Sequence, residues 1–388
     1  MRLFRTLSTT RLVVLLVSVA ALAAAAAGFA VAASGGSGDT PPAKPLAQAI
    51  HDSLAAPKPQ GISADIVFTN KLFPSGALLG QAGSALMSGA TGRFWATNDG
   101  RGRLELQSSA GDVQVVWNTE KVTIYDASSN TAYVFTLPPK KADAAPDKNA
   151  GPPSVAEISD FLSKVAEKAT VSGAQPSNVA GQPAYTVEVS PKHSGDLLGS
   201  VQLAWDAAQG IPLRIAVYAQ GNSSPVLELK ATNISYGPVS DGDVNVSPPA
   251  GAKVVDLGGH ESGAAHGSGP SVNGLDAVQA AAGFPVTAPD TLVGLPRKDV
   301  RLVGKTVLAV YGQGLGAIVL VENKADTAAH GKTGILSSLP TVALDGVTAH
   351  ELATQLGTVV EWQRGGVDFV LAGSLPPAAA EAAARSLK

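Results

Sequence analysis

The sequence predicts a mainly β protein of the α+β class, followed by a smaller α+β module at the C-terminal end. Between residues 92 and 139, apolar and polar residues alternate in short runs, and the turn-forming sequences NDG, SAGD, NTE and SSN separate these runs. The chain also holds 42 glycines and 26 prolines, as a turn-rich β protein needs. Alternation with a period of two indicates antiparallel strands with one apolar face. That face must either be covered by a second layer or bind something apolar.

Residues 1–33 have the features of an export signal. Arg2, Arg5 and Arg11 precede an apolar segment that ends in small-residue cleavage motifs. The segment is also long enough to cross a bilayer, so an uncleaved anchor is the alternative, although its alanine-rich second half inserts weakly. In both cases the positive-inside rule places the folded part outside the cytoplasm, either secreted or anchored to the cell membrane. Residues 34–44 have the composition of a linker.

A first domain is expected over 45–255. Apolar residues recur at helical spacing over 45–55, which predicts an amphipathic helix, and a strand is expected over 61–70. Residues 71–89 are apolar but glycine-rich, which favours a long loop or lid over a core strand. Ser154 and Glu157 form a capping box that predicts the start of a second helix. Further strands are expected over 184–190, 200–206, 213–220 and 226–236.

A second, smaller module is expected over 274–388, after a flexible linker over 256–273. Its predicted helices cover 275–282, 350–356 and 378–387. Its predicted strands cover 298–303, 306–311, 316–323 and 341–345, followed by a hairpin of 359–362 with 367–372.

Composition excludes several classes of function. The net charge is −3 and no basic stripe with interleaved aromatic residues is present, so we expect no nucleic acid as a partner. The chain has no cysteine, which excludes disulfides, thiolate metal sites, cysteine nucleophiles and a lipid-modified N-terminal cysteine.

The motifs that suggest chemistry have simpler interpretations. His260, Glu261 and His266 lack the H-E-x-x-H spacing of a zinc helix and lie in the predicted linker, so a solvated linker is favoured over a metal site. The G-x-G-x-G sequence that begins at Gly312 is interpreted as a hairpin turn, because no helix follows it to bind phosphate. His350 belongs to a capping-box pattern. We therefore expect no enzyme, no catalytic residues, no metal and no cofactor.

The first domain resembles the LolA-like lipoprotein-carrier superfamily, which includes the RseB/MucB regulators. The resemblance covers roughly residues 45–250 and is carried by Gly92-Arg-Phe-Trp95, Arg103-Leu-Glu-Leu106, Val115-Val-Trp117, Ile124-Tyr-Asp126 and Ala204-Trp-Asp206. It implies a curved, incomplete antiparallel β-barrel with helices covering its mouth. It also implies that the concave face holds acyl chains or a lipoprotein.

The second module resembles a C-terminal domain of sporulation-associated and anti-sigma-related extracytoplasmic proteins of Gram-positive bacteria. The resemblance is carried by Phe284-Pro-Val-Thr-Ala-Pro289, Leu308-Ala-Val-Tyr311, Val360-Glu-Trp362, Val367-Asp-Phe369 and Leu371-Ala-Gly373. The tandem of the two domains resembles an actinobacterial or related Gram-positive arrangement. No activity is attached to this module.

The candidate site is an apolar cavity in the first domain, because two helices are little cover for a sheet of this size. Its expected lining is Ile62, Ile66, Phe68, Phe94, Leu104, Leu106, Val115, Trp117, Leu203 and Trp205. Its expected lid consists of Leu72, Phe73, Leu78, Leu79, Leu86 and Met87. The alternative is an ordinary core in which this apolar face is filled.

Three hypotheses for function follow. The first is an exported, monomeric, non-enzymatic binding protein whose partners are lipid or lipoprotein acyl chains. The second, in the manner of the RseB branch, is an envelope-stress regulator that acts on a membrane protein, an anti-sigma factor. The third is a structural envelope protein with a filled core.

Overall fold

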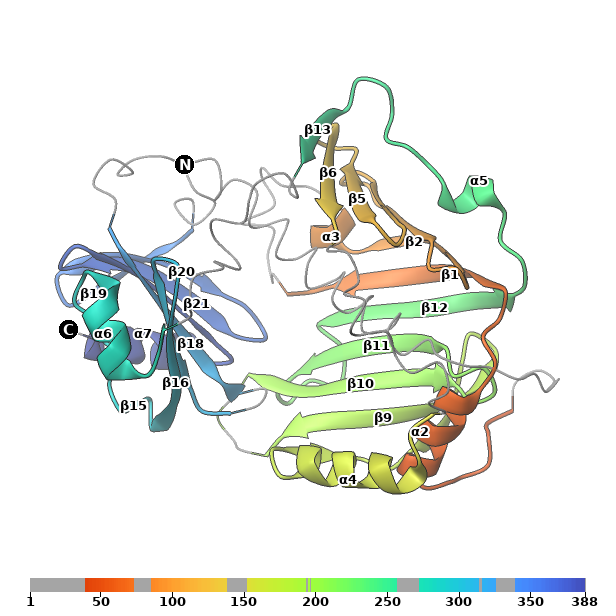
Figure 1. The fold of residues 1–388 in the computed structure, drawn as a ribbon, viewed down its shortest axis with the longest axis horizontal. Coiled ribbons are helices and arrows are strands. Elements are labelled where there is room, and N and C mark those ends of the chain that lie inside the picture. Colours follow the sequence, from red (N-terminus) through yellow and green to blue (C-terminus); the bar gives the residue numbers. More distant parts are fainter. Residues whose placement is uncertain are drawn as a thin grey trace.

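Two β-sheets make up most of the computed structural model, and neither closes into a barrel (Figure 1). The structure describes residues 39–72, 85–137, 152–192, 195, 197–256, 272–313, 316–325 and 339–387. The predicted signal segment 1–33 and most of the predicted linker 256–273 lie outside these residues. None of the helices in the described ranges has the length and apolar character that a bilayer span requires.

The larger sheet is formed by the strands of the first domain. Within the described residues it has thirteen strands in the order β13-β6-β5-β4-β3-β2-β1-β12-β11-β10-β9-β7, and β8 also pairs with β9. The bounds are β1 Gly61–Asn70, β2 Ala90–Thr97, β3 Gly102–Gln107, β4 Val113–Trp117, β5 Lys121–Asp126, β6 Thr131–Thr136, β7 Ala169–Val171, β8 Gln175–Val179, β9 Gln182–Pro191, β10 Leu198–Asp206, β11 Pro212–Ala219, β12 Leu227–Tyr236 and β13 Lys253–Asp256. Neighbouring strands are antiparallel except β13, which runs parallel to β6.

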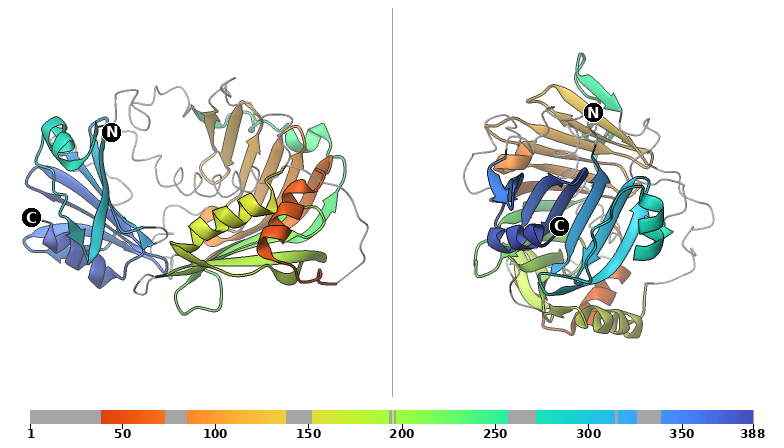
Figure 2. Two further views of the ribbon diagram at one scale, coloured as in Figure 1. Left: turned by 60° about the horizontal axis from the view of Figure 1, so that its bottom comes forward. Right: turned by 90° about the vertical axis from the view of Figure 1, so that its left-hand side faces the viewer.

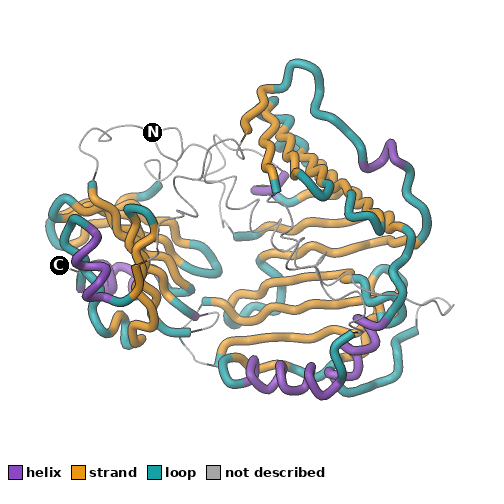
Figure 3. The backbone as a smooth tube through the Cα atoms, in the orientation of Figure 1, coloured by secondary structure: helices purple, strands orange, loops and turns teal. Residues whose placement is uncertain are grey.

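The larger sheet curls toward the side on which helix α2 (Leu46–Ala55) lies, and we call this side the inner face (Figures 1 and 2). Ala49 of α2 packs there against Tyr185 of β9 and Trp205 of β10. Helix α4 (Val155–Ala166) lies beside α2 at the β7 edge of the sheet. Helices α3 (Ala85–Ser88) and α5 (Asp241–Val244) are short, and Figure 3 shows how little of this domain is helical. The inner face is therefore covered by helix mainly at one end.

The predicted capping box of α4 is present. The Ser154 Oγ accepts the Glu157 N–H at 3.3 Å, and the Glu157 Oε2 accepts the Ser154 N–H at 2.8 Å. These two bonds satisfy amide groups that an uncapped helix would leave unpaired. The start of the helix is thus determined by local sequence.

The core of the larger sheet lies on the inner face of β1–β5. Ile66, Phe68, Leu106 and Ile124 alternate with polar residues along their strands and are buried together, as the period of two predicts. Leu86 of α3 packs onto the same cluster. This end of the inner face is filled by the protein's own side chains.

The second sheet has nine strands within the described residues, in the order β14-β16-β17-β18-β22-β21-β20-β19, with β15 paired to β16. The bounds are β14 Val272–Asn273, β15 Thr291–Leu292, β16 Leu295–Val303, β17 Thr306–Tyr311, β18 Ile318–Lys324, β19 Thr341–Leu344, β20 Val347–Ala353, β21 Thr358–Arg364 and β22 Val367–Gly373. Helices α6 (Leu275–Ala282) and α7 (Pro377–Ser386) pack against one face through Val278, Ala380 and Ala384. This face forms a core separate from that of the larger sheet.

The helix predicted over 350–356 is wrong, because these residues belong to strand β20 and the turn after it. Asp345 and Gly346 both have positive φ, 44° and 91°, and form the tight turn of a β19–β20 hairpin. Ala349 pairs with Val342 on one side and with Trp362 on the other. The ladder bonds of these neighbours outweigh the capping-box pattern around His350.

The short strands β7, β8, β13, β14 and β15 were not predicted. Each has two to five residues, too few for a periodic pattern to be recognised. Their pairing partners, rather than their own sequences, determine that they are strands.

Candidate functional site

Two rows of apolar side chains cross four strands on the inner face of the larger sheet. In each row, residues of β9, β10, β11 and β12 stand opposite one another in the ladder. The first row is Val187, Leu203, Ile215 and Leu229, and the second is Val189, Val201, Val217 and Leu227. We call these eight residues the inner patch.

The inner patch is apolar but not buried. None of its eight side chains is in the buried class, and Leu203 near its centre is 36% exposed. Phe68, which continues the first row from Leu229 onto β1, is only 4% exposed. Within the described residues, the same face of one sheet therefore changes from a filled core at β1 to a half-buried apolar surface, exposed at Leu203, over β9–β12.

The opposite, outer face of these four strands is mostly polar, with the small buried residues Ala204 and Ala216 between its polar side chains. Arg214 of β11 donates from Nε to Glu228 Oε1 at 2.6 Å and from a terminal nitrogen to Gln202 Oε1 at 2.8 Å. Gln202 in turn donates to Glu188 Oε2 at 2.7 Å. This hydrogen-bonded chain crosses β9–β12, so the outer face needs no cover, whereas the inner patch does.

The turn after β10 is held by a buried carboxylate. Asp206 Oδ1 accepts the N–H groups of Ala208 and Gln209 at 2.8 Å, and its Oδ2 accepts the Tyr236 hydroxyl at 2.6 Å. Burial, together with the nearby Asp206 charge, raises the pKa of Tyr236, so the hydroxyl stays a donor at all ordinary pH values. Asp206 is thus engaged in positioning β10 and β11 under the inner patch.

The predicted lining residues occupy three different environments. Ile66, Phe68, Leu106 and Val115 are buried in the core, and Ile62, Phe94, Leu104 and Trp117 are half-buried against it. Trp205 is buried beneath α2, with its ring 6.0 Å from that of Tyr185. Leu203 belongs to the inner patch. An aspartate at Leu106 would therefore test folding, whereas one at Leu203 tests binding.

Half of the predicted lid lies outside the described residues, namely Phe73, Leu78 and Leu79. Leu72 is half-buried, and Leu86 is buried in the core through α3. Met87 also lies in α3.

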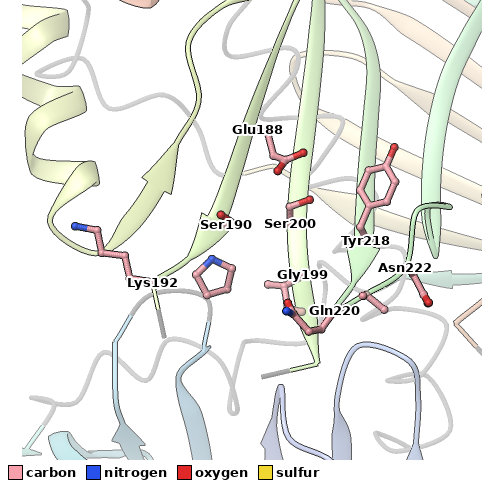
Figure 4. Close-up of a pocket in the computed structure, with 12 residues that line it drawn as sticks. Glu188, Ser190, Lys192, Gly199, Ser200, Tyr218, Gln220 and Asn222 are labelled. Atoms are coloured by element: carbon pink, nitrogen blue, oxygen red, sulfur yellow. The ribbon is translucent and has the colours of Figure 1, made fainter. Parts of the chain in front are cut away.

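A hollow of about 430 Å³ lies at the end of β9–β11 next to the second sheet (Figure 4). Glu188, Ser190, Ser200 and Tyr218 are among its lining residues, and Lys192 lies at its margin. Polar groups of both charges surround it, so it does not suit an acyl chain.

The other motifs of the sequence do not assemble a reactive centre in the part of the chain that the structure describes. No group of three potential metal ligands occurs there, and His260, Glu261 and His266 lie outside it. The loop after Tyr311 connects the antiparallel pair β17–β18, as the hairpin interpretation predicts. Asp126 accepts the Ser128 N–H at 2.9 Å and is a turn residue.

Comparison with known proteins gives only distant likenesses. No protein-family model matches the chain, and none of the curated proteins matches it. MucB in complex with MucA(peri) is 16% identical with a TM-score of 0.42, over 88% of this chain and 96% of that one. The complex of MucA and MucB from Pseudomonas aeruginosa is 17% identical with a TM-score of 0.39, over 87% of this chain and 94% of that one. A domain from Vibrio parahaemolyticus, assigned provisionally to outer-membrane lipoprotein sorting, is 12% identical with a TM-score of 0.18, over 48% of this chain and 89% of that one. At these values we base no inference on the likenesses.

Seven of the eight inner-patch residues were missed in the sequence, although their strands were predicted. The alternation was visible in TVEVS over 186–190, VQL over 201–203 and RIAV over 214–217. The missing information was register, because only cross-strand pairing shows that these residues form one continuous surface.

Proposed function

We propose that this protein is an extracytoplasmic, non-enzymatic binding protein that holds an acyl chain of a lipid or lipoprotein on its inner patch. The observation that supports this best is the pair of apolar rows across β9–β12, whose members line up in the ladder yet are only half-buried, or exposed as at Leu203, in the part of the chain that the structure describes. The apolar segment preceded by arginines at the N-terminus supports a location outside the cytoplasm.

An acyl chain suits this surface energetically. Each buried methylene contributes roughly 0.8 kcal/mol, so a chain of about fourteen carbons supplies on the order of 10 kcal/mol before the costs of association. All eight patch residues are Val, Leu or Ile and offer no polar side-chain group that would select for a hydrogen-bonding ligand. Binding here rests on apolar burial, and specificity for a headgroup would have to come from elsewhere.

Substitution of Leu203 tests the proposal. We expect Leu203→Asp to weaken the binding of parinaric acid, a fluorescent fatty acid, at least tenfold, because a charge would be buried under the chain. Val254→Asp is the matched control, since Val254 is 62% exposed on β13, away from the patch. Fluorescence titration gives both affinities. Equal affinity of Leu203→Asp and wild type would refute an acyl site on the inner patch.

Native mass spectrometry of the protein purified from its own envelope, before and after solvent extraction, tests the ligand class. A discrete added mass that extraction removes would identify a carried lipid. A ligand-free mass, with no uptake of parinaric acid, would instead favour the regulator that acts on a membrane anti-sigma factor.

A further inference from the structure

The second sheet also has an apolar face that no described helix covers. Val307, Ala309 and Tyr311 of β17 point into the core under α6 and α7, so the alternate residues Leu308 and Val310 lie on the other face. The ladder continues this face across β18, β22 and β21. Its larger apolar residues are Leu308, Val310, Val319, Val321, Val359 and Val370, which we call the second wall, and Glu361 of β21 stands opposite Val370 at the margin of this face.

Strand β17 reads as a nearly continuous apolar run, and shorter apolar runs occur in the other three strands, over 318–321 in β18, 369–372 in β22 and 359–360 in β21. Such runs are typical of strands that are buried on both faces. Yet none of the six second-wall residues is in the buried class, whereas their neighbours Val307, Leu320 and Leu371 are fully buried. One face of the second sheet therefore carries a half-buried apolar stretch, bordered by Glu361, that no helix among the described residues covers.

The second wall is turned toward the larger sheet. Helices α6 and α7 lie on the side of the second sheet that faces away from the larger one (Figures 1 and 2). The two sheets meet where the Leu197 N–H donates to Ser374 O at 3.1 Å and the Leu198 N–H donates to Ser374 Oγ at 2.7 Å. Val201 of the inner patch shortly follows Leu198, and the strand that carries Val370 ends just before Ser374. The two apolar surfaces thus begin at one junction.

We propose that the second wall contacts the same acyl chain as the inner patch, so that the chain is held between two sheets; this inference rests on the proposed function. A chain lying on one open sheet keeps much of its surface in water, whereas binding sites for apolar ligands usually bury most of the ligand. A second apolar surface on the opposite side completes that burial.

The chemistry of the second wall favours an acyl chain over a peptide. Strands β18 and β22 are central in their sheet, and their backbone groups are already paired on both edges. The six side chains add no donor or acceptor, and Glu361 at the margin adds a single carboxyl group, so a peptide backbone buried here would lose most of its hydrogen bonds to water without replacement. An acyl chain has no such groups to satisfy.

The test compares Val319→Asp with Leu203→Asp and Val254→Asp in the full chain, with parinaric acid as the probe. We expect the first two variants each to weaken binding at least tenfold and the third to bind like wild type. A loss in Leu203→Asp alone would overturn the second wall but leave the proposed function intact. No loss in either variant would overturn both. Lower thermal stability of Val319→Asp with unchanged binding would assign this face to packing within the chain.

A second measurement serves if Val319→Asp does not fold. The chain has no cysteine, so Val319→Cys and, as the control, Val254→Cys are labelled specifically with the small fluorophore bimane. We expect added oleate to shift the bimane emission to the blue at residue 319 and not at residue 254. Equal spectra with and without oleate at residue 319 would overturn the second wall.

Discussion

Glu322 carries a carboxylate into the core of the second sheet. Its side chain is fully buried between Val307 and Phe369 in the ladder, and its Oε2 accepts the Thr287 N–H at 2.8 Å. Its Oε1 has no hydrogen-bond partner among the described residues. Burial raises the pKa of Glu322 to about 7, against the opposing effect of the Thr287 N–H. The protonated form is therefore the one that the fold favours.

Glu322 is expected to make the protein less stable as pH rises. Between its ordinary pKa and about 7, the folded state retains a proton that the unfolded chain has lost, so the free energy of unfolding falls through this window. The shift corresponds to a loss of about 3 kcal/mol. Chemical denaturation of wild type and Glu322→Gln at a series of pH values measures this loss. The glutamine is a suitable reference because its amide oxygen can still accept the Thr287 N–H but does not titrate.

The difference between the two proteins isolates Glu322 from the other carboxyl groups. Burial also raises the pKa of Glu351 and Glu361, while hydrogen bonds to Ser154 lower that of Glu157. These contributions are common to both proteins and cancel. If the difference in unfolding free energy were constant from pH 4 to 8, Glu322 would not titrate with a raised pKa.

Single residues also show the limit of what a pattern predicts. Leu106 lies between Glu105 and Gln107, Leu203 follows Gln202, and both leucines were predicted to line a cavity. Leu106 is 2% exposed under α3 and its neighbours, whereas Leu203 is 36% exposed. Alternation identifies the apolar face of a strand, but what lies over that face depends on distant segments.

Among the elements, α4 is the one whose start is encoded most locally. Ser154→Ala removes the hydroxyl that accepts the Glu157 N–H, and we expect a loss of about 1 kcal/mol in the free energy of unfolding. Ser159→Ala is the control, because the Ser159 hydroxyl donates to Val155 O within the helix and caps nothing. Urea denaturation measures the free energy of unfolding of both variants. Equal stabilities of the two variants would mean that packing against α2, rather than the cap, determines where α4 begins.

The contrast between α4 and β20 shows why elements differ in predictability. Both have a Thr/Ser-x-x-Glu sequence, Ser154 to Glu157 in one and Thr348 to Glu351 in the other. In α4 the pattern precedes an amphipathic helix whose main contacts among the described residues are with α2 and the edge strand β7. In β20 it lies between two strands that supply partners for both edges of the backbone. Neighbours in the sheet therefore override the local signal.

At the scale of the whole molecule, the two sheets follow from composition and alternation, but their order does not. The pairing of β1 with β12 joins residues far apart in the sequence, and it determines that the filled core adjoins the inner patch. The parallel pair β13–β6 is likewise invisible in local pattern. The existence of an apolar face was predictable, whereas its division into a filled and an open part required the register of every strand.

In the described part of the chain, polar contacts at the junction link the two sheets. Besides the bonds of Ser374, Gln355 in the β20–β21 turn accepts from Asn222 Nδ2 at 3.1 Å and donates to Lys71 O at 2.7 Å. Lys71 follows β1 and Asn222 lies between β11 and β12. These contacts link the second sheet to the ends of the strands that carry the inner patch.

Removal of these contacts should loosen the orientation of the sheets without unfolding either one, because each sheet has its own core. We expect Ser374→Ala combined with Gln355→Ala to broaden the distance distribution between spin labels on Asp160→Cys and Lys305→Cys, measured by double electron–electron resonance. Gln363→Ala, which loses a bond to Asp368 within the second sheet, should leave the distribution narrow. If an acyl chain is held between the sheets, added oleate should narrow it again in the double variant. An unchanged distribution in the double variant would show that other contacts orient the second wall toward the inner patch.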